Sequence, residues 1–152
     1  MSMSEYVQTF TILMADDDEE DCLLAKDALA EAGLPHQIRF VADGEELLDY
    51  LQGAGDFAQP RITPRPDLIL LDLNMPRRDG REALRMLKSD KQLQKIPVVV
   101  LTTSTAQSDI SYSYNVGASS YIAKPTSFRG WIELLETLTQ YWFKLVELPG
   151  WK

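Results

Sequence analysis

Sulfur and imidazole ligands are scarce in this sequence, which has one cysteine and one histidine among 152 residues. Cys22 has no partner for an internal disulfide, and one cysteine with one histidine cannot build a structural zinc site. Because no histidine is close to it in the sequence, Cys22 is predicted to be buried on a helix as a small apolar side chain. His36 is predicted to lie in a loop or at the surface.

Long apolar runs and an excess of positive charge are also lacking. The longest apolar stretches, such as 68–71 and 97–101, are far below the roughly 20 residues that cross a bilayer. The N-terminus has no basic region followed by an apolar core, so export is not indicated and a cytoplasmic location is predicted. With 15 Lys and Arg against 23 Asp and Glu, the net charge of −8 disfavours binding to nucleic acid or to anionic membranes.

What is present is the composition of an ordinary globular protein, 45% hydrophobic and 25% charged, with a length that suits one domain over residues 1–152. Short apolar runs alternate with segments of helical period, which is typical of a parallel sheet covered by helices on both faces. We therefore predict a doubly wound α/β fold. Its strands are expected at 10–15, 38–41, 68–73, 98–102 and 120–123.

Helix boundaries are predicted from capping residues. Asp43 is expected to cap the second helix together with Glu46, and Gly33 and Gly53 are expected to end the first and second helices. Later helices are predicted at about 79–89, at 107–115 and from about residue 128. The stretch 52–66 is rich in glycine and proline and is predicted to form a projecting loop.

The C-terminal helix and tail, residues 128–152, carry more apolar residues than one core-facing stripe requires. One interpretation is that the terminal turns fold back over the domain. We favour the other, in which the surplus forms a surface for a second copy of the chain or for a partner, because isolated domains rarely expose large apolar patches.

Charged and polar residues follow four of the predicted strands. Asp16 and Asp17 follow the first strand, Asp72 lies at the end of the third, Thr102 ends the fourth and Lys124 follows the fifth. In a doubly wound sheet these carboxyl ends form the ligand-binding edge, so we expect the five side chains to meet there. Each residue alone is more often a helix cap or a loop residue, and only their joint occurrence indicates a site.

Three neighbouring carboxylates repel one another unless a cation or protonation neutralises them. Oxygen ligands without histidine or cysteine favour Mg²⁺, which usually combines one or two carboxylates with a phosphate oxygen. A phosphoryl group is therefore the expected visitor, with Asp72 as the nucleophile. Lys124 is expected to compensate its negative oxygens, and Thr102 to donate a hydrogen bond to one of them. Asp18 and Glu19 extend the acidic run and are expected only to favour the positive start of a helix.

These motifs together resemble the receiver domain of two-component response regulators. The resemblance is carried by Asp16-Asp17 after an apolar strand, by LILLDLNMPRRDG around Asp72, by PVVVLTTS around Thr102 and by Lys124-Pro125 after SSYIA. It covers essentially the whole chain and implies a flavodoxin-like sheet of five strands in the order 2-1-3-4-5.

The resemblance also implies a function. In this family Asp72 would accept a phosphoryl group from a sensor histidine kinase, and the metal would be held by Asp16, Asp17, Asp72 and the backbone carbonyl of Asn74. Thr102 and Tyr121 would form a switch that changes a protein-binding face. The protein is then not an enzyme in the usual sense, because it catalyses only its own phosphoryl transfer and dephosphorylation.

Within the family, the proline-rich loop and the tail TLTQYWFKLVELP look like stand-alone regulators paired with phytochrome-type kinases. This likeness implies a homodimer formed through the C-terminal helix region. Two alternatives remain open. One is a receiver-like module that binds a partner without phosphorylation. The other is a phosphatase of the haloacid-dehalogenase class, which needs a second aspartate where this chain has Asn74.

Overall fold

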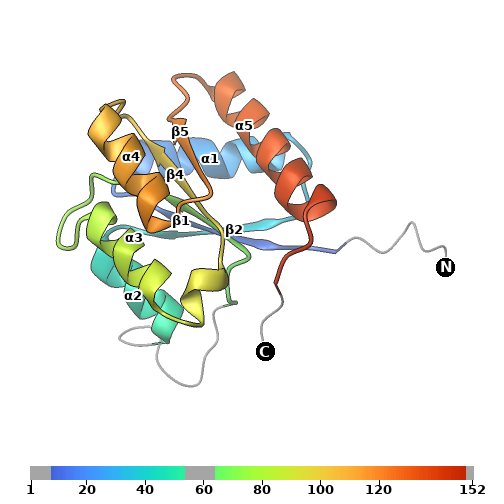
Figure 1. The fold of residues 1–152 in the computed structure, drawn as a ribbon. Helices are drawn as coiled ribbons and strands as arrows, with labels where there is room; N and C mark the ends of the chain where they lie inside the picture. The colour runs from blue at the N-terminus through green and yellow to red at the C-terminus, as the bar shows by residue number, and fades with distance from the viewer. Residues whose placement is uncertain (1–7, 54–63, 150–152) are drawn as a thin grey trace.

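The computed structural model describes residues 8–53 and 64–149, and its centre is a parallel five-stranded sheet in the order β2-β1-β3-β4-β5 (Figure 1). The predicted fold and strand order are confirmed. The observed strands start or end within two residues of the predicted limits. They are β1 Thr11–Ala15, β2 Gln37–Val41, β3 Leu68–Leu71, β4 Val98–Thr102 and β5 Ser120–Ala123.

Five α-helices connect the strands and follow the last one. They are α1 Glu19–Glu31, α2 Gly44–Gln52, α3 Gly80–Ser89, α4 Gln107–Val116 and α5 Phe128–Gln140. A short 3₁₀ turn, η3 Leu93–Lys95, precedes β4, and one wider π-type turn, η4 Tyr141–Leu145, extends α5. Within the described part of the chain, no helix has the length and apolar character that spanning a bilayer requires.

Aspartate side chains start three of these helices. Asp43 accepts a hydrogen bond from the Glu46 N–H at 2.8 Å, as predicted, and Asp79 caps α3 in the same manner. Asp18 caps α1, which explains one member of the acidic run as a helix start. Gly53 ends α2 with a φ of +67°, as predicted. The first helix ends at Glu31, two residues before Gly33.

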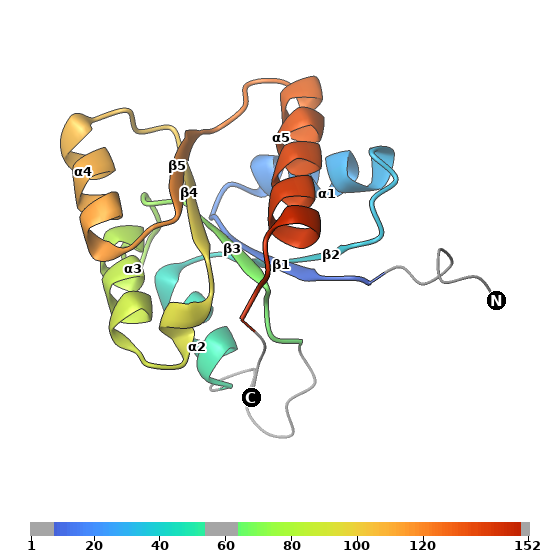
Figure 2. The ribbon, with the colours of Figure 1, turned by 45° about the vertical axis from the view of Figure 1, so that its right-hand side comes forward.

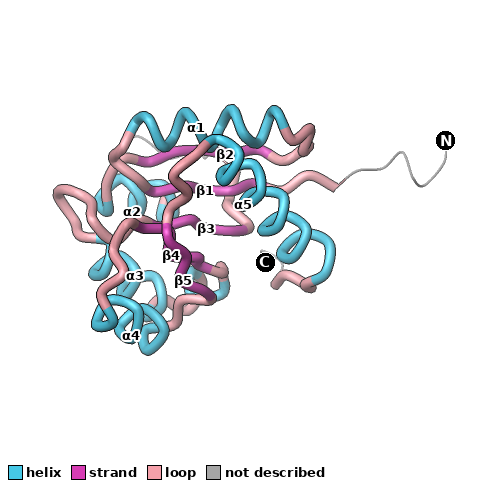
Figure 3. The backbone as a smooth tube through the Cα atoms, turned by 90° about the horizontal axis from the view of Figure 1, so that it is seen from above, coloured by secondary structure: helices cyan, strands magenta, loops and turns pink. Residues whose placement is uncertain are grey.

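Helices cover both faces of the sheet, α1 and α5 on one side and α2, α3 and α4 on the other (Figures 2 and 3). β1, β3 and β4 are buried along their whole length, because each is apolar and lies between two helical layers. The α1 and α5 layer buries Trp131, and the α2 and α3 layer buries Tyr50. Both faces therefore contribute to the core, and the carboxyl ends of the strands remain free for a site.

At the amino end of the sheet, the C-terminal turn packs against the start of β1. The rings of Phe10 and Phe143 stack with centroids 4.4 Å apart, and His36 lies against both. The Nδ1 atom of His36 accepts a hydrogen bond from the Phe10 N–H at 3.2 Å. His36 lies in a loop as predicted, but it is enclosed by two rings, and burial lowers its pKa.

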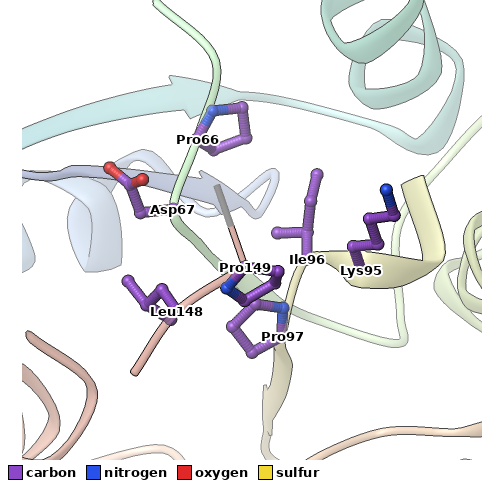
Figure 4. Close-up of a pocket in the computed structure, with 7 residues that line it drawn as sticks. All are labelled: Pro66, Asp67, Lys95, Ile96, Pro97, Leu148 and Pro149. Atoms are coloured by element: carbon purple, nitrogen blue, oxygen red, sulfur yellow. The ribbon is translucent and has the colours of Figure 1, made fainter. Parts of the chain in front are cut away.

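The apolar surplus of the C-terminal region divides into two parts. Trp131, Leu135 and Leu138 form the core-facing stripe of α5, and Phe143 of η4 is buried in the same layer, as the interpretation that the terminal turns fold back predicts. Tyr141 and Leu145 are 51% and 70% exposed. Beyond η4, the described chain passes close to the starts of β3 and β4, where Figure 4 shows the residues that line a pocket. It is lined by Pro66, Asp67, Lys95, Ile96, Pro97, Leu148 and Pro149.

Cys22 and the loop 52–66 agree with their predictions only in part. Cys22 lies on α1 as expected, but it is half-buried instead of buried, and its thiol donates to the Asp16 carbonyl oxygen at 3.7 Å. In the predicted loop 52–66, residues 54–63 lie outside the described residues, whereas Gly53 ends α2 and Pro66 is buried.

Candidate functional site

The strand register brings Asp16 and Asp72 side by side at the carboxyl edge of the sheet. Ala15 pairs with Leu71, and the Asp72 N–H donates to the Ala15 carbonyl at 3.0 Å. The Asp16 N–H extends the other ladder to Val41, also at 3.0 Å. Both side chains are buried, and oxygens of Asp16, Asp17 and Asp72 lie within 4.8 Å of one another. The predicted acidic cluster is therefore assembled, with Asp17 on its exposed side.

Lys124 reaches this cluster from the edge strand β5. Its backbone is fixed by a hydrogen bond from its N–H to the Thr102 carbonyl at 3.0 Å. Its ammonium nitrogen lies 2.7 Å from Asp16 Oδ2, 2.9 Å from Asp21 Oδ2 and 3.1 Å from Asp72 Oδ2. Three carboxylates thus contact one ammonium group whose side chain is 7% exposed.

The charges of this cluster are unequal. Burial raises the pKa of Asp16 to about 6, although the hydrogen bond to Lys124 and the backbone of Asp18 act in the opposite direction. Burial alone lowers the pKa of Lys124, but its bonds to Asp16 and Asp21 reverse this and hold the pKa above its usual range. The lysine therefore stays charged, but its single positive charge does not balance the three carboxylates that contact it.

The donor set fits a divalent cation. Asp16, Asp17 and Asp72 offer carboxylate oxygens without sulfur or imidazole, which hard cations prefer. A divalent charge offsets the repulsion that one lysine leaves among the carboxylates.

Asn74 lies at the same edge, in the loop after β3. Its N–H donates to Asp72 Oδ1 at 3.2 Å, and its side chain is exposed. The predicted use of its backbone carbonyl as a metal ligand stays a prediction. Gly80 closes this loop by donating its N–H to the Leu73 carbonyl at 2.9 Å. A methyl group at Gly80 would overlap the Asp72 carbonyl oxygen, so the loop beside the site requires glycine there.

Thr102 and Tyr121 meet around the loop that follows β4. Thr102 is fully buried, and its hydroxyl oxygen accepts a long hydrogen bond from the Ser104 N–H at 3.4 Å. The Tyr121 hydroxyl donates to the Ser104 carbonyl at 2.8 Å, while the Tyr121 N–H donates to the Tyr114 hydroxyl. Both predicted switch residues therefore form hydrogen bonds with the backbone of Ser104.

An ion-pair network, which sequence reasoning missed, joins α3 to α4 next to this loop. Arg81 forms two hydrogen bonds to Asp109, at 2.7 and 2.8 Å, and Ser104 Oγ donates to the same carboxylate at 2.7 Å. These bonds lower the pKa of Asp109 to about 2. The network links α3 and α4 to the loop after β4.

Asp21 is the other site residue that sequence reasoning missed. Its signal was the helical spacing of 21, 25 and 28, which places it in line with the buried Ala25 and Ala28 on the inner side of α1. An aspartate at the head of a buried stripe lies close to the strand ends, because α1 starts only four residues after β1.

Comparison with known proteins gives a consistent result. The family model described as the response regulator receiver domain matches residues 12–136. The chain belongs to this family. Two relatives are Response regulator Rcp1 of Synechocystis sp., 35% identical over 91% of this chain and 92% of Rcp1, and the probable methanogenesis regulatory protein FilR2 of Methanothrix harundinacea, 37% identical over 93% and 88%.

Solved receivers share the fold closely. The phosphorylated cyanobacterial phytochrome response regulator RcpA superposes with a TM-score of 0.85 and 38% identity, covering 94% of this chain and 100% of RcpA. The Mn²⁺-bound form of Rcp1 gives 0.82 and 34%, covering 93% and 99%. RPA3017, from red light signalling of R. palustris, gives 0.85 and 36%, covering 92% and 98%. This chain is therefore a two-component receiver homologous to phytochrome response regulators, a family in which phosphorylation on aspartate is general.

Proposed function

We propose that this receiver accepts a phosphoryl group on Asp72 in a Mg²⁺-dependent reaction. One observation carries the proposal. The ammonium group of Lys124 contacts Asp72 at 3.1 Å inside a cluster of carboxylates whose charge it cannot offset alone. Such a cluster favours a cation and, with it, a phosphoryl oxygen.

The transfer step is a nucleophilic displacement. A carboxylate oxygen of Asp72 forms a bond to phosphorus while the bond from phosphorus to the donor breaks, and the donor group leaves as histidine imidazole or, from acetyl phosphate, as acetate. Lys124 neutralises charge on the phosphoryl oxygens, and the Thr102 hydroxyl donates to one of them. When bound, Mg²⁺ offsets negative charge between Asp72 and the incoming group, with Asp16, Asp17, Asp72 and the Asn74 carbonyl as the proposed ligands.

The proposed output is a change in the face formed by α4 and β5. Once Thr102 turns toward the phosphoryl group, its bond with the Ser104 N–H is lost, and the loop that also holds the Tyr121 hydroxyl is free to shift. The new charge at Asp72 thus biases a small two-state element, which is how receivers transmit a local event.

The proposed donor is a sensor histidine kinase of the phytochrome type, in the cytoplasm. The support is the similarity to RcpA and to RPA3017, which extends over nearly the whole of both proteins. Membership of the receiver family supports the histidine kinase, and these two relatives support the light-sensing pathway.

We also propose that two copies of the chain associate through the C-terminal region. The support is the exposure of Phe128, Tyr141 and Leu145 along α5 and η4. Removing the whole tail would also delete buried Leu138 and Phe143, so the sharper test is Leu145→Glu. Light scattering at micromolar concentration is expected to show a dimer for the wild type and a monomer for this variant. A wild-type monomer would contradict the dimer.

The phosphorylation experiment uses acetyl phosphate and intact-mass measurement. The wild type is expected to gain one phosphate with Mg²⁺ and none with EDTA, and Asp72→Asn is expected to gain none. Asp90→Asn removes an aspartate whose side chain accepts backbone hydrogen bonds from Gln92 and Leu93 between α3 and η3; it is the matched control and is expected to label like the wild type. If the wild type stays unmodified with acetyl phosphate and with a phosphorylated kinase, the protein is a binding module without phosphorylation. A phosphatase is not supported, because Asn74 cannot act as the general acid.

A further inference from the structure

Lys124 has three carboxylate partners in this structure, and two of them have other duties in the proposed reaction, on which this inference rests. Asp72 becomes a phosphoryl ester, and Asp16 is a proposed metal ligand. Asp21, on the first turn of α1, contacts Lys124 at 2.9 Å and is assigned neither task. Among the described residues it is therefore the one carboxylate partner of the ammonium group that has no other task in the proposed transfer.

The position of Lys124 explains why such a partner matters. The lysine follows the edge strand β5, while Asp72 and Asp16 follow β3 and β1, so the side chain must reach across the end of β4. Neighbouring strands are about 4.8 Å apart, so the ends of β5 and β3 are separated by roughly 10 Å, and the extended lysine side chain and the aspartate side chain span this gap together. A hydrogen bond at the far side restrains the ammonium group in that extended position.

We propose that Asp21 is a positioning residue, which by its hydrogen bond keeps the Lys124 ammonium group directed at Asp72 during phosphoryl transfer. The lysine donates hydrogen bonds to Asp21 at 2.9 Å and to Asp72 at 3.1 Å, and its nitrogen forms an ion pair with Asp16 at 2.7 Å. The longest of the three contacts is the one to Asp72. During transfer the hydrogen bond from Lys124 to Asp72 is replaced by one to a phosphoryl oxygen, while the bond to Asp21 keeps the Lys124 nitrogen in position. The Asp21 side chain is 19% exposed, so solvent competes little for this bond.

The test separates the hydrogen bond from the charge of Asp21. Asp21→Ala removes both, and Asp21→Asn removes the charge but keeps an oxygen that can accept from Lys124. Phosphorylation rates are measured in the full chain at saturating Mg²⁺ and over a range of acetyl phosphate. Asp21→Ala is expected to lower the maximal rate about tenfold with an unchanged half-saturation concentration, and Asp21→Asn is expected to recover it to within about threefold of wild type.

A matched control removes a charge from the same turn without touching the lysine. Glu20 is exposed and has no side-chain bond to Lys124, so Glu20→Ala is expected to match the wild type. Equal slowing by Asp21→Ala and Asp21→Asn would assign the effect to charge and overturn the proposal. A faster rate in either variant would mean that Asp21 competes for Lys124, and unchanged rates would make the contact merely structural. Both results also overturn it.

A second measurement does not depend on phosphorylation. In ¹⁵N-lysine NMR of the protein without metal, the Lys124 ammonium signal is expected to be protected from exchange with water in the wild type and in Asp21→Asn. In Asp21→Ala the signal is expected to broaden or disappear. If no variant is labelled by acetyl phosphate, the proposed function fails, whereas unchanged protection in Asp21→Ala contradicts the positioning role alone.

Discussion

The two ends of the sheet are built on opposite principles. At the amino end, Phe10, His36 and Phe143 pack ring against ring, and the neutral histidine accepts a backbone hydrogen bond. At the carboxyl end, buried Asp16 and Asp72 share Lys124, and burial raises the pKa of Asp16. The amino end stabilises the fold through apolar contact, whereas the carboxyl end keeps a charge imbalance that a ligand can relieve. Substitutions at the two ends should therefore separate stability from phosphorylation.

Gly80→Ala is expected to have the largest effect, because its methyl group would overlap the backbone of Asp72. We expect the unfolding free energy to fall by about 3 to 4 kcal/mol and phosphorylation to be lost. Gly33→Ala is the comparison near the start of β2, where φ is +68° but the space around the Cβ position is open. It should lower stability by about 1 kcal/mol and leave labelling intact. Urea denaturation and intact-mass labelling test both, and equal losses in the two variants would contradict this difference.

Phe143→Ala tests whether the amino end serves stability alone. It removes a buried ring that stacks on Phe10, so the unfolding free energy should fall by about 3 kcal/mol. The phosphorylation rate, measured at a temperature where the variant stays folded, should match the wild type. A slower rate in the folded variant would show that the two ends are coupled.

Asp16→Asn, unlike Phe143→Ala, should raise the stability of the metal-free protein. The pKa of Asp16 is about 6 in the fold against an ordinary 3.8, so the folded state binds more protons between these values and loses stability as pH rises through 6. In EDTA at pH 7 the variant should be more stable by about 1 to 2 kcal/mol and should lack this pH dependence. Its response to Mg²⁺ should weaken. Denaturation curves of both proteins at pH 4.5 and 7 measure this difference in stability. A variant less stable than the wild type at pH 7 would contradict an excess of negative charge at the site.

The fold and most side chains of the site could be predicted from the sequence for one reason. Residues that directly follow parallel strands must meet at one edge, so Asp16, Asp72 and Lys124 could be placed from strand positions alone. Asp21 could be placed only from the rotation of α1 against the sheet. The contact of Phe10 with Phe143 joins residues at opposite ends of the chain, which no local pattern indicates.

His36 carries the smallest expected effect. Burial lowers its pKa, with Lys144 acting in the same direction and Asp67 against it, so the fold favours the neutral ring. The stability that the neutral His36 ring contributes is fully present above the ordinary histidine pKa of about 6.5. It is lost as pH falls through the lowered pKa. His36→Gln should therefore be less sensitive between pH 7 and 5 than the wild type in thermal denaturation. An equal pH response in both proteins would remove His36 from this account.

The central claim, that the carboxyl end transfers phosphate to one defined carboxylate, is tested most directly by locating the phosphoryl group. After labelling with acetyl phosphate and Mg²⁺, borohydride reduces an aspartyl phosphate to homoserine, which peptide mass spectrometry assigns to a position. Homoserine is expected at position 72 and at no other aspartate of the cluster. Homoserine at position 16, 17 or 21, or its absence from a labelled protein, would contradict it.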